Sequence, residues 1–275
     1  MKFAICNETF QNWPFSRALA LAAECGYTGI EIAPFTIAEN AREITPARRT
    51  ELRRQAEQAG LAVVGLHWLL ARTEGYYLTS PTRETRLRTG LYLGELARLC
   101  RDLGGTVLVL GSPQQRNLLA GVSPEQACDY AADSIAAALP ALDDCQVTLA
   151  LEPLGPEEGN FLLTAQAAVE LIERIDSPRV RLQLDVKAMS SEGTPVTDII
   201  RGHAAHLAHF HANDPNRRGP GMGDVDFVPI LQALRDVAYQ GWISVEVFDY
   251  APGIERLARD SIGYLRGCLA HLEAA

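Results

Sequence analysis

Short apolar runs alternate with longer segments of helical period along the whole chain. Eight runs rich in Val, Ile, Leu and Ala recur about every 34 residues, the size of one βα unit. They are 2–7, 29–35, 62–69, 106–113, 147–154, 180–186, 207–214 and 242–248. Strands that are apolar on both faces are typical of a parallel sheet covered by helices. The pattern therefore predicts eight parallel strands, each followed by a helix.

The segments between the runs carry helix start and stop signals. Predicted helices over 47–60, 125–139 and 165–175 follow Thr45-Pro46, Ser123-Pro124 and Thr164, which are favourable capping residues. Other segments end at Gly26, Gly60, Gly104-Gly105 and Pro140. Eight such units close one (β/α)8 TIM barrel, so we expect residues 1–275 to form a single domain.

An open doubly wound sheet is the structural alternative, because its elements alternate in the same way. Such a sheet usually has a Gly-rich phosphate turn after the first strand. The chain reads CNETFQNWP at that place, and no low-complexity linker divides it. The barrel is therefore favoured over two domains.

The composition argues against several classes of binding partner and structural framework. The balance of 25 Lys and Arg against 34 Asp and Glu gives a net charge of −9, which argues against nucleic-acid binding. Six scattered cysteines without a Cys-x-x-Cys pair indicate core residues rather than a zinc ribbon or a disulfide framework. Neither a secretory signal nor a membrane span of roughly 20 apolar residues is evident, so we expect a cytoplasmic protein.

Chemistry in a barrel of this type lies at the carboxyl ends of the strands, so the last polar residue of each run is informative. These residues are Asn7, Glu8, Glu31, His67, Ser112, Glu152, Asp185, His211 and Glu246. Ionised carboxylates at apolar strand ends are costly unless a cation compensates them. Glu152, Asp185, His211 and Glu246, from the fifth to eighth runs, therefore predict one divalent metal site. Three carboxylates and an imidazole favour Mn²⁺, Mg²⁺ or Co²⁺, and Zn²⁺ stays open.

Several motifs together resemble the xylose isomerase-like superfamily of barrels, which includes AP endonuclease family 2. Within it, the chain is similar to the sugar isomerases and epimerases typified by D-tagatose 3-epimerase. The motifs are Glu152-Pro153-Leu154, Glu158, Phe161-Leu162-x-Thr164, Asp185 closing LQLD, His211-x-x-x-x-Asn216-Arg217-Arg218-x-Pro220-Gly221-x-Gly223, and Val245-Glu246. The resemblance extends over nearly the whole chain.

The resemblance implies roles for individual residues. Glu152, Asp185, His211 and Glu246 match the family's metal ligands. Glu152 and Glu246 also match the pair that removes and returns a proton beside a carbonyl. Arg217 and Glu158 stand where the epimerases hold substrate oxygens. At the position of a substrate-binding histidine of the epimerases this chain has Ala188, preceded by Lys187, which departs from the family pattern.

Further substrate contacts are predicted from their places in the chain. His67 ends the third run, and Ser112 and Arg116 lie at and after the end of the fourth. Arg116, Lys187 and Arg217 would form a small cationic mouth, which favours an anionic substrate such as a sugar phosphate or sugar acid.

The remaining candidates near the predicted site are aromatic residues, a further histidine and two loops. Phe10, Trp13, Phe35 and Trp68 are candidates for stacking on a sugar, with at least two expected in the core instead. His209 is expected to pack in the barrel rather than bind metal. The loops 71–82 and 213–224 are candidate lids.

The leading hypothesis is a metal-dependent isomerase or epimerase of a ketose, a sugar phosphate or a sugar acid, a small carbohydrate in each case. The alternatives are a lyase that dehydrates a keto-inositol or an oxidised sugar, and a non-catalytic sugar-binding barrel. A DNA-repair endonuclease is disfavoured by the six histidines and the net charge. By resemblance, a homodimer or homotetramer is expected.

Overall fold

The eight strands close into a parallel barrel in which each strand pairs with its sequence neighbours and β1 pairs with β8. The computed structural model describes residues 1–274. The strands are β1 (Lys2–Cys6), β2 (Gly29–Ile32), β3 (Ala62–Leu66), β4 (Val107–Leu110), β5 (Thr148–Leu151), β6 (Val180–Asp185), β7 (Leu207–Ala212) and β8 (Trp242–Val245). The predicted (β/α)8 fold is confirmed, and all eight apolar runs contain a strand.

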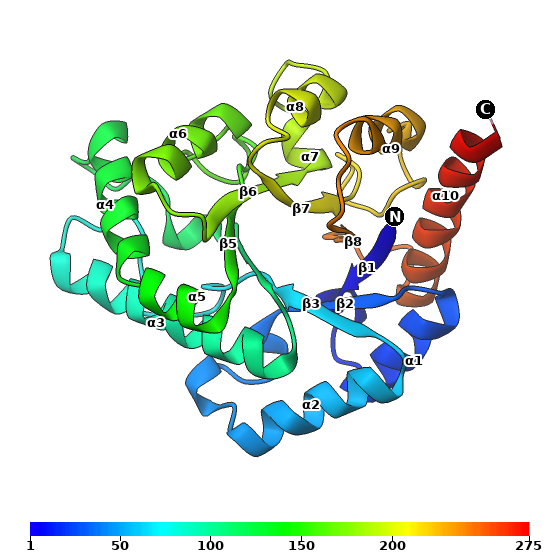
Figure 1. The fold of residues 1–275 in the computed structure, drawn as a ribbon, viewed down its shortest axis with the longest axis horizontal. Coiled ribbons are helices and arrows are strands. Elements are labelled where there is room, and N and C mark those ends of the chain that lie inside the picture. Colours follow the sequence, from blue (N-terminus) through cyan, green and yellow to red (C-terminus); the bar gives the residue numbers. More distant parts are fainter. Residues whose placement is uncertain (275) are drawn as a thin grey trace.

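A ring of helices surrounds the barrel (Figure 1). They are α1 (Phe15–Cys25), α2 (Pro46–Gln58), α3 (Arg83–Leu103), α4 (Pro124–Ala136), α5 (Leu139–Cys145), α6 (Ala165–Ile175), α7 (Val186–Met189), α8 (Val196–Gly202), α9 (Phe227–Asp236) and α10 (Ile254–Ala274). Because helices cover the outer face and side chains fill the interior, the strands are buried at almost every position. This double burial explains why the runs lack polar alternation.

Capping residues set the helix boundaries that the sequence predicts. The Thr164 hydroxyl accepts a hydrogen bond from the Ala167 amide at 3.1 Å, and Ser123 forms a reciprocal capping box with Gln126. The predicted helix over 125–139 is wrong in extent, because the segment divides into α4 and α5. Pro140 lies in the first turn of α5, where its missing N–H costs nothing, rather than ending a helix.

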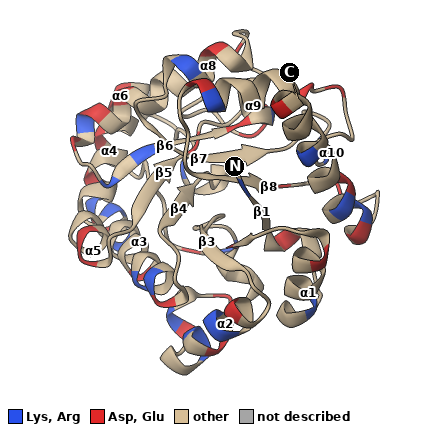
Figure 2. Cartoon of the chain, turned by 45° about the vertical axis from the view of Figure 1, so that its right-hand side comes forward, with Lys and Arg blue, Asp and Glu red and all other residues tan. Residues whose placement is uncertain are grey.

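The surface and the cysteines agree with the composition. Lys and Arg are interspersed with Asp and Glu along the outer helices (Figure 2). Four of the six cysteines are buried, all six are free, and Cys25 and Cys128 are half-buried. Within residues 1–274, no helix combines the length and the apolar character needed to cross a membrane.

Candidate active site

Four polar side chains meet where β5 to β8 end. Glu152 follows β5, Asp185 ends β6, His211 lies in β7 and Glu246 follows β8. The β6–β7 register places Asp185 directly beside His211. One possible ligand atom from each of the four lies within 4.8 Å of the others, and all four side chains are buried. The structure thus brings together the four residues that the sequence analysis grouped.

Glu246 is held from both sides. Its Oε1 accepts a hydrogen bond from the Trp68 indole N–H at 2.8 Å and lies 3.1 Å from His67 Nδ1. Its Oε2 lies 2.9 Å from His211 Nδ1. Trp68 reaches this position from a left-handed backbone conformation with φ of 52°, which is uncommon for a bulky residue. The side chains of Trp68 and His67 therefore fix the orientation of the Glu246 carboxylate.

Asp185 joins the site to the start of α7. Its Oδ1 accepts a hydrogen bond from the Ala188 amide at 2.8 Å and so caps that helix, while Oδ2 accepts one from the Asn213 side chain at 2.5 Å. Both oxygens are thereby oriented by groups outside the four-residue cluster.

A buried carboxylate on the opposite side of the barrel orients His211. Glu31 of β2 lies 3.2 Å from His211 Nε2 and 2.8 Å from His209 Nε2. The contact leaves His211 Nδ1 facing the other carboxylates, which is the arrangement of many metal-binding histidines. His209 packs against Glu31 and belongs to none of the potential ligand groups within residues 1–274, in line with its predicted core role. The sequence analysis assigned no role to Glu31, although a lone charge inside an apolar strand was a signal.

Glu152 packs against a position that requires glycine. A Cβ atom built on Gly111, directly after β4, would overlap Glu152 Oε2. The Glu152 carboxylate therefore occupies space that any larger residue at 111 would fill.

We expect Gly111→Ala to displace the Glu152 carboxylate and to lower kcat by about 100-fold or more, because small misplacements of catalytic groups are costly. Gly267→Ala in α10 is the matched control, since a Cβ there meets no atom within 4 Å. That control should keep full activity and gain up to about 1 kcal/mol of stability. Steady-state kinetics and thermal melts of both variants measure these effects. Unchanged kcat in Gly111→Ala would contradict the prediction.

The buried charges of the cluster are unequally compensated. Burial raises the pKa of Glu152, and the charge of Glu246 adds to the increase. Burial also raises the pKa of Asp185 to about 6. Burial acts on Glu246 in the same direction, but the His211 and His67 imidazoles outweigh it and hold the pKa of Glu246 below its usual range. The charges of Glu152, whose Oε1 lies 3.7 Å from His211 Nδ1, and of Asp185 are thus compensated less than that of Glu246.

A divalent cation fits this cluster. Three carboxylates and one imidazole are the donors that Mn²⁺, Mg²⁺ or Co²⁺ accept, and the added charge would compensate Glu152 and Asp185. Glu31 supports the imidazole from behind, and Asn213 supports Asp185.

We expect the metal-free protein to lose stability as the pH rises through about 6. Because the pKa of Asp185 in the fold exceeds its ordinary value of 3.8, protonated Asp185 stabilises the fold fully below about pH 4. That contribution is lost as Asp185 ionises. Urea unfolding of chelator-dialysed protein between pH 4 and 7 measures the effect against Asp185→Asn, whose amide does not titrate. Parallel pH profiles for the two proteins would exclude this role of Asp185.

A cavity of about 400 Å³ opens beside Glu152 and Glu246. Three predicted substrate-binding residues, Ser112, Glu158 and Arg217, line it. Arg72 and Phe248, which the sequence analysis did not single out, line it as well. His67 instead lies behind Glu246 and is fully buried. The cavity therefore places neutral, acidic and basic groups around the two carboxylates.

The three expected cations do not form one cationic mouth. Lys187 pairs with Glu158 and lies 5.0 Å from the Phe248 ring centroid. Arg116 is only 1% exposed, because its guanidinium turns inward and donates to the Leu110 carbonyl at 3.1 Å. Burial lowers the pKa of Arg116 to about 10. Of the three, only Arg217 lines the cavity without a carboxylate partner among residues 1–274.

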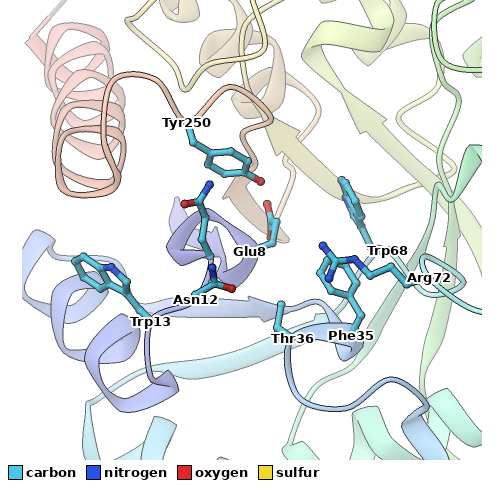
Figure 3. Close-up of a pocket in the computed structure, with 9 residues that line it drawn as sticks. Glu8, Asn12, Trp13, Phe35, Thr36, Trp68, Arg72 and Tyr250 are labelled. Carbon is cyan, nitrogen blue, oxygen red and sulfur yellow. The ribbon is translucent and has the colours of Figure 1, made fainter.

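A second cavity of about 600 Å³ adjoins the first, with Trp68 and Arg72 in the wall of both (Figure 3). Trp13 and Phe35 also line it, whereas Phe10 packs in the core at 1% exposure. Only one of the four aromatic residues is therefore buried in the core, so the expectation that at least two would be is wrong. Glu8, which stands at the end of the first apolar run and was assigned no role, lines this cavity too.

The loop 213–224 is fastened by its own side chains. Asp214 accepts hydrogen bonds from the Asn216 and Val225 amides at 3.2 and 3.1 Å, and the Asn216 side chain donates to the Met222 carbonyl at 2.7 Å. Arg217 has φ of 72° within this loop and lines the first cavity. The loop thus holds Arg217 at the site.

Comparisons with known proteins agree with the barrel. A D-psicose 3-epimerase of Enterocloster bolteae is 34% identical over 143 residues, which cover 46% of this chain and 48% of that protein. The hydroxypyruvate isomerase of Escherichia coli is 24% identical over 245 residues, covering 86% and 89% of the two chains. A crystal structure of a D-psicose 3-epimerase in the presence of D-fructose superimposes with a TM-score of 0.86 at 21% identity, covering 98% and 99%.

The family model described as xylose isomerase-like TIM barrel matches residues 19–268, which span most of the chain. This protein therefore belongs to the family of xylose isomerase-like TIM barrels.

Proposed function

We propose that this protein is a metal-dependent isomerase or epimerase of a ketose, a ketose phosphate or a sugar acid. The observation that carries the proposal is that Glu152 and Glu246 line one cavity while clustering with Asp185 and His211. The names of its relatives, a D-psicose 3-epimerase and a hydroxypyruvate isomerase, support the same reaction class.

The four clustered residues would hold the ion. A divalent cation, Mn²⁺ in the first place, would supply Lewis-acid stabilisation of the negative charge that develops when a carbon beside a carbonyl loses its proton. Asp185 and His211 would serve as ligands only, since each is oriented by a group behind it.

Glu152 and Glu246 would move the proton. In this proposal one carboxylate removes the proton from the carbon beside the carbonyl, and the other returns it to the opposite face to give an epimer. Transfer between neighbouring carbons gives an aldose–ketose pair instead. Trp68 and His67, which contact the Glu246 carboxylate, would hold it in place for this transfer.

Glu158 and Arg217 would orient substrate oxygens. Both line the cavity, and Lys187 balances the charge of Glu158. No imidazole is present at position 188, where Ala188 contributes its backbone amide to Asp185. The substrate contact that the resemblance to the epimerases implies for a histidine at this position is thus absent here.

Isotope exchange with product analysis tests the proposal. The metal-loaded protein is incubated in D₂O with ketoses, ketose phosphates, keto-acids, keto-inositols and oxidised sugars, with and without Mn²⁺. We expect metal-dependent incorporation of deuterium at a carbon beside the carbonyl of an otherwise unchanged skeleton. Loss of water or of an aglycone would assign a lyase, and no turnover of any compound would refute the enzyme hypothesis.

A further inference from the structure

The second cavity is larger than the one that contains the reacting carboxylates. The first, at about 400 Å³, already lies within the range of sites for small ligands. The adjoining space of about 600 Å³ is therefore not needed for one sugar ring. Since Trp68 and Arg72 line both spaces, a ligand that extends out of the first cavity enters the second.

Aromatic side chains form part of the wall. Phe35 and Trp68 lie with their ring centroids 5.7 Å apart at 50°, and Trp13 lines the cavity from the loop after β1. The Arg72 guanidinium lies 4.4 Å from the Phe35 ring centroid. Apolar ring faces next to planar hydrogen-bonding groups suit a sugar, whose C–H faces stack while its hydroxyls bond at the edge.

One buried polar atom in this wall lacks a partner. Glu8 Oε2 lies 2.9 Å from His67 Nε2, whereas Glu8 Oε1 has no hydrogen-bond partner. Glu8 is 5% exposed, and Figure 3 shows its carboxylate between Tyr250 and Trp68. Arg72 is exposed, and its guanidinium lies over the Phe35 ring. A buried carboxylate oxygen without a donor is costly, and a hydroxyl group of a ligand would relieve that cost at Glu8 Oε1.

The charge of the wall distinguishes between ligand classes. A phosphate or carboxylate next to Glu8 would meet a like-charged group, whereas a neutral polyol donates to it. We infer that this cavity is a subsite for a second sugar ring, so that the substrate is a keto-sugar joined to another sugar by a glycosidic bond. The inference rests on the proposed function for the first cavity and names the larger substrate of that site.

Kinetics with matched sugars test the inference. D-fructose is compared with the three glucosyl-fructoses that carry glucose on O1, O4 or O6. We expect at least one disaccharide to show kcat/KM about tenfold above that of fructose, the gain expected from stacking and hydrogen bonding of a second ring. In Phe35→Ala the ratio of kcat/KM for the disaccharide to kcat/KM for fructose should fall to about one. Equal or lower kcat/KM for all three disaccharides overturns the inference.

Intrinsic fluorescence separates failure of the subsite from failure of the reaction. Two of the three tryptophans, Trp13 and Trp68, line the cavity, while Trp242 begins β8 at the other end of the barrel. Methyl β-D-glucoside, which cannot react, should cause a saturable change in emission. The Kd should rise about tenfold in Glu8→Gln. The matched control, Glu157→Gln, removes an exposed carboxylate outside this cavity and should bind as the wild type does.

The outcomes are distinct. Saturation by the glucoside supports the subsite even where no sugar turns over, in which case only the proposed reaction fails. Saturation by inorganic phosphate and not by the glucoside overturns the inference in favour of an anion site. No change in emission with either probe overturns it as well.

Discussion

The Glu152→Gln variant is expected to lose about 1,000-fold of kcat, the effect typical of removing a general acid or base. Glutamine fills the same space beside Gly111 but cannot accept the proton. Because burial raises the pKa of Glu152, neutralising it removes an unfavourable charge, so the melting temperature of the metal-free protein should not fall. Steady-state kinetics with the sugar identified by isotope exchange, together with thermal melts, measure both effects.

Glu246→Gln should lose as much activity and, unlike Glu152→Gln, also stability. Its carboxylate is paired with His211 and His67, which hold its pKa below the usual range. Glu157→Gln serves as the control for both, since Glu157 is exposed. Wild-type kcat in either active-site variant would refute proton transfer by this pair.

Addition of Mn²⁺ to chelator-treated protein should raise its melting temperature by about 5–10 °C and restore activity. A free Mn²⁺ concentration of 100 times its Kd adds about 2.7 kcal/mol to the free energy of unfolding. Each kcal/mol shifts the melting temperature of a chain this long by about 2–4 °C. The reason is that the charges of the buried Glu152 and Asp185 are only partly compensated, so that burial raises the pKa of both.

Asp185→Asn should abolish most of that thermal shift, because it removes one carboxylate ligand while keeping the size of the side chain. Asp198→Asn, an exposed residue of α8, is the matched control and should respond as the wild type does. Thermal melts and metal analysis of all three proteins decide the question. An undiminished shift in Asp185→Asn would exclude this cluster as the metal site.

The barrel and the four-residue cluster were predictable because both follow from local patterns. Each apolar run ends in the residue that the strand delivers to the mouth, so Glu152, Asp185 and Glu246 could be located from position alone. The contact between Glu31 and His209 could not be found this way, because it joins β2 to β7 across the barrel.

The directions of side chains in loops were the other feature that the sequence could not predict. Arg116 was expected at the mouth, but the Leu110 carbonyl and the nearby Glu152 charge draw its guanidinium inward. Trp68 reaches Glu246 only through an unusual backbone conformation that no sequence pattern announces.

The cap that Asp185 places on α7 uncouples the Asp185 carboxylate from the side chain at position 188. Its Oδ1 bonds to the backbone amide of residue 188, a donor that every residue type except proline supplies. The side chain at 188 can therefore differ from the histidine that the resemblance to the epimerases implies without loss of this bond. Substitutions at 188 should thus alter contacts in the site while the orientation of Asp185 stays the same.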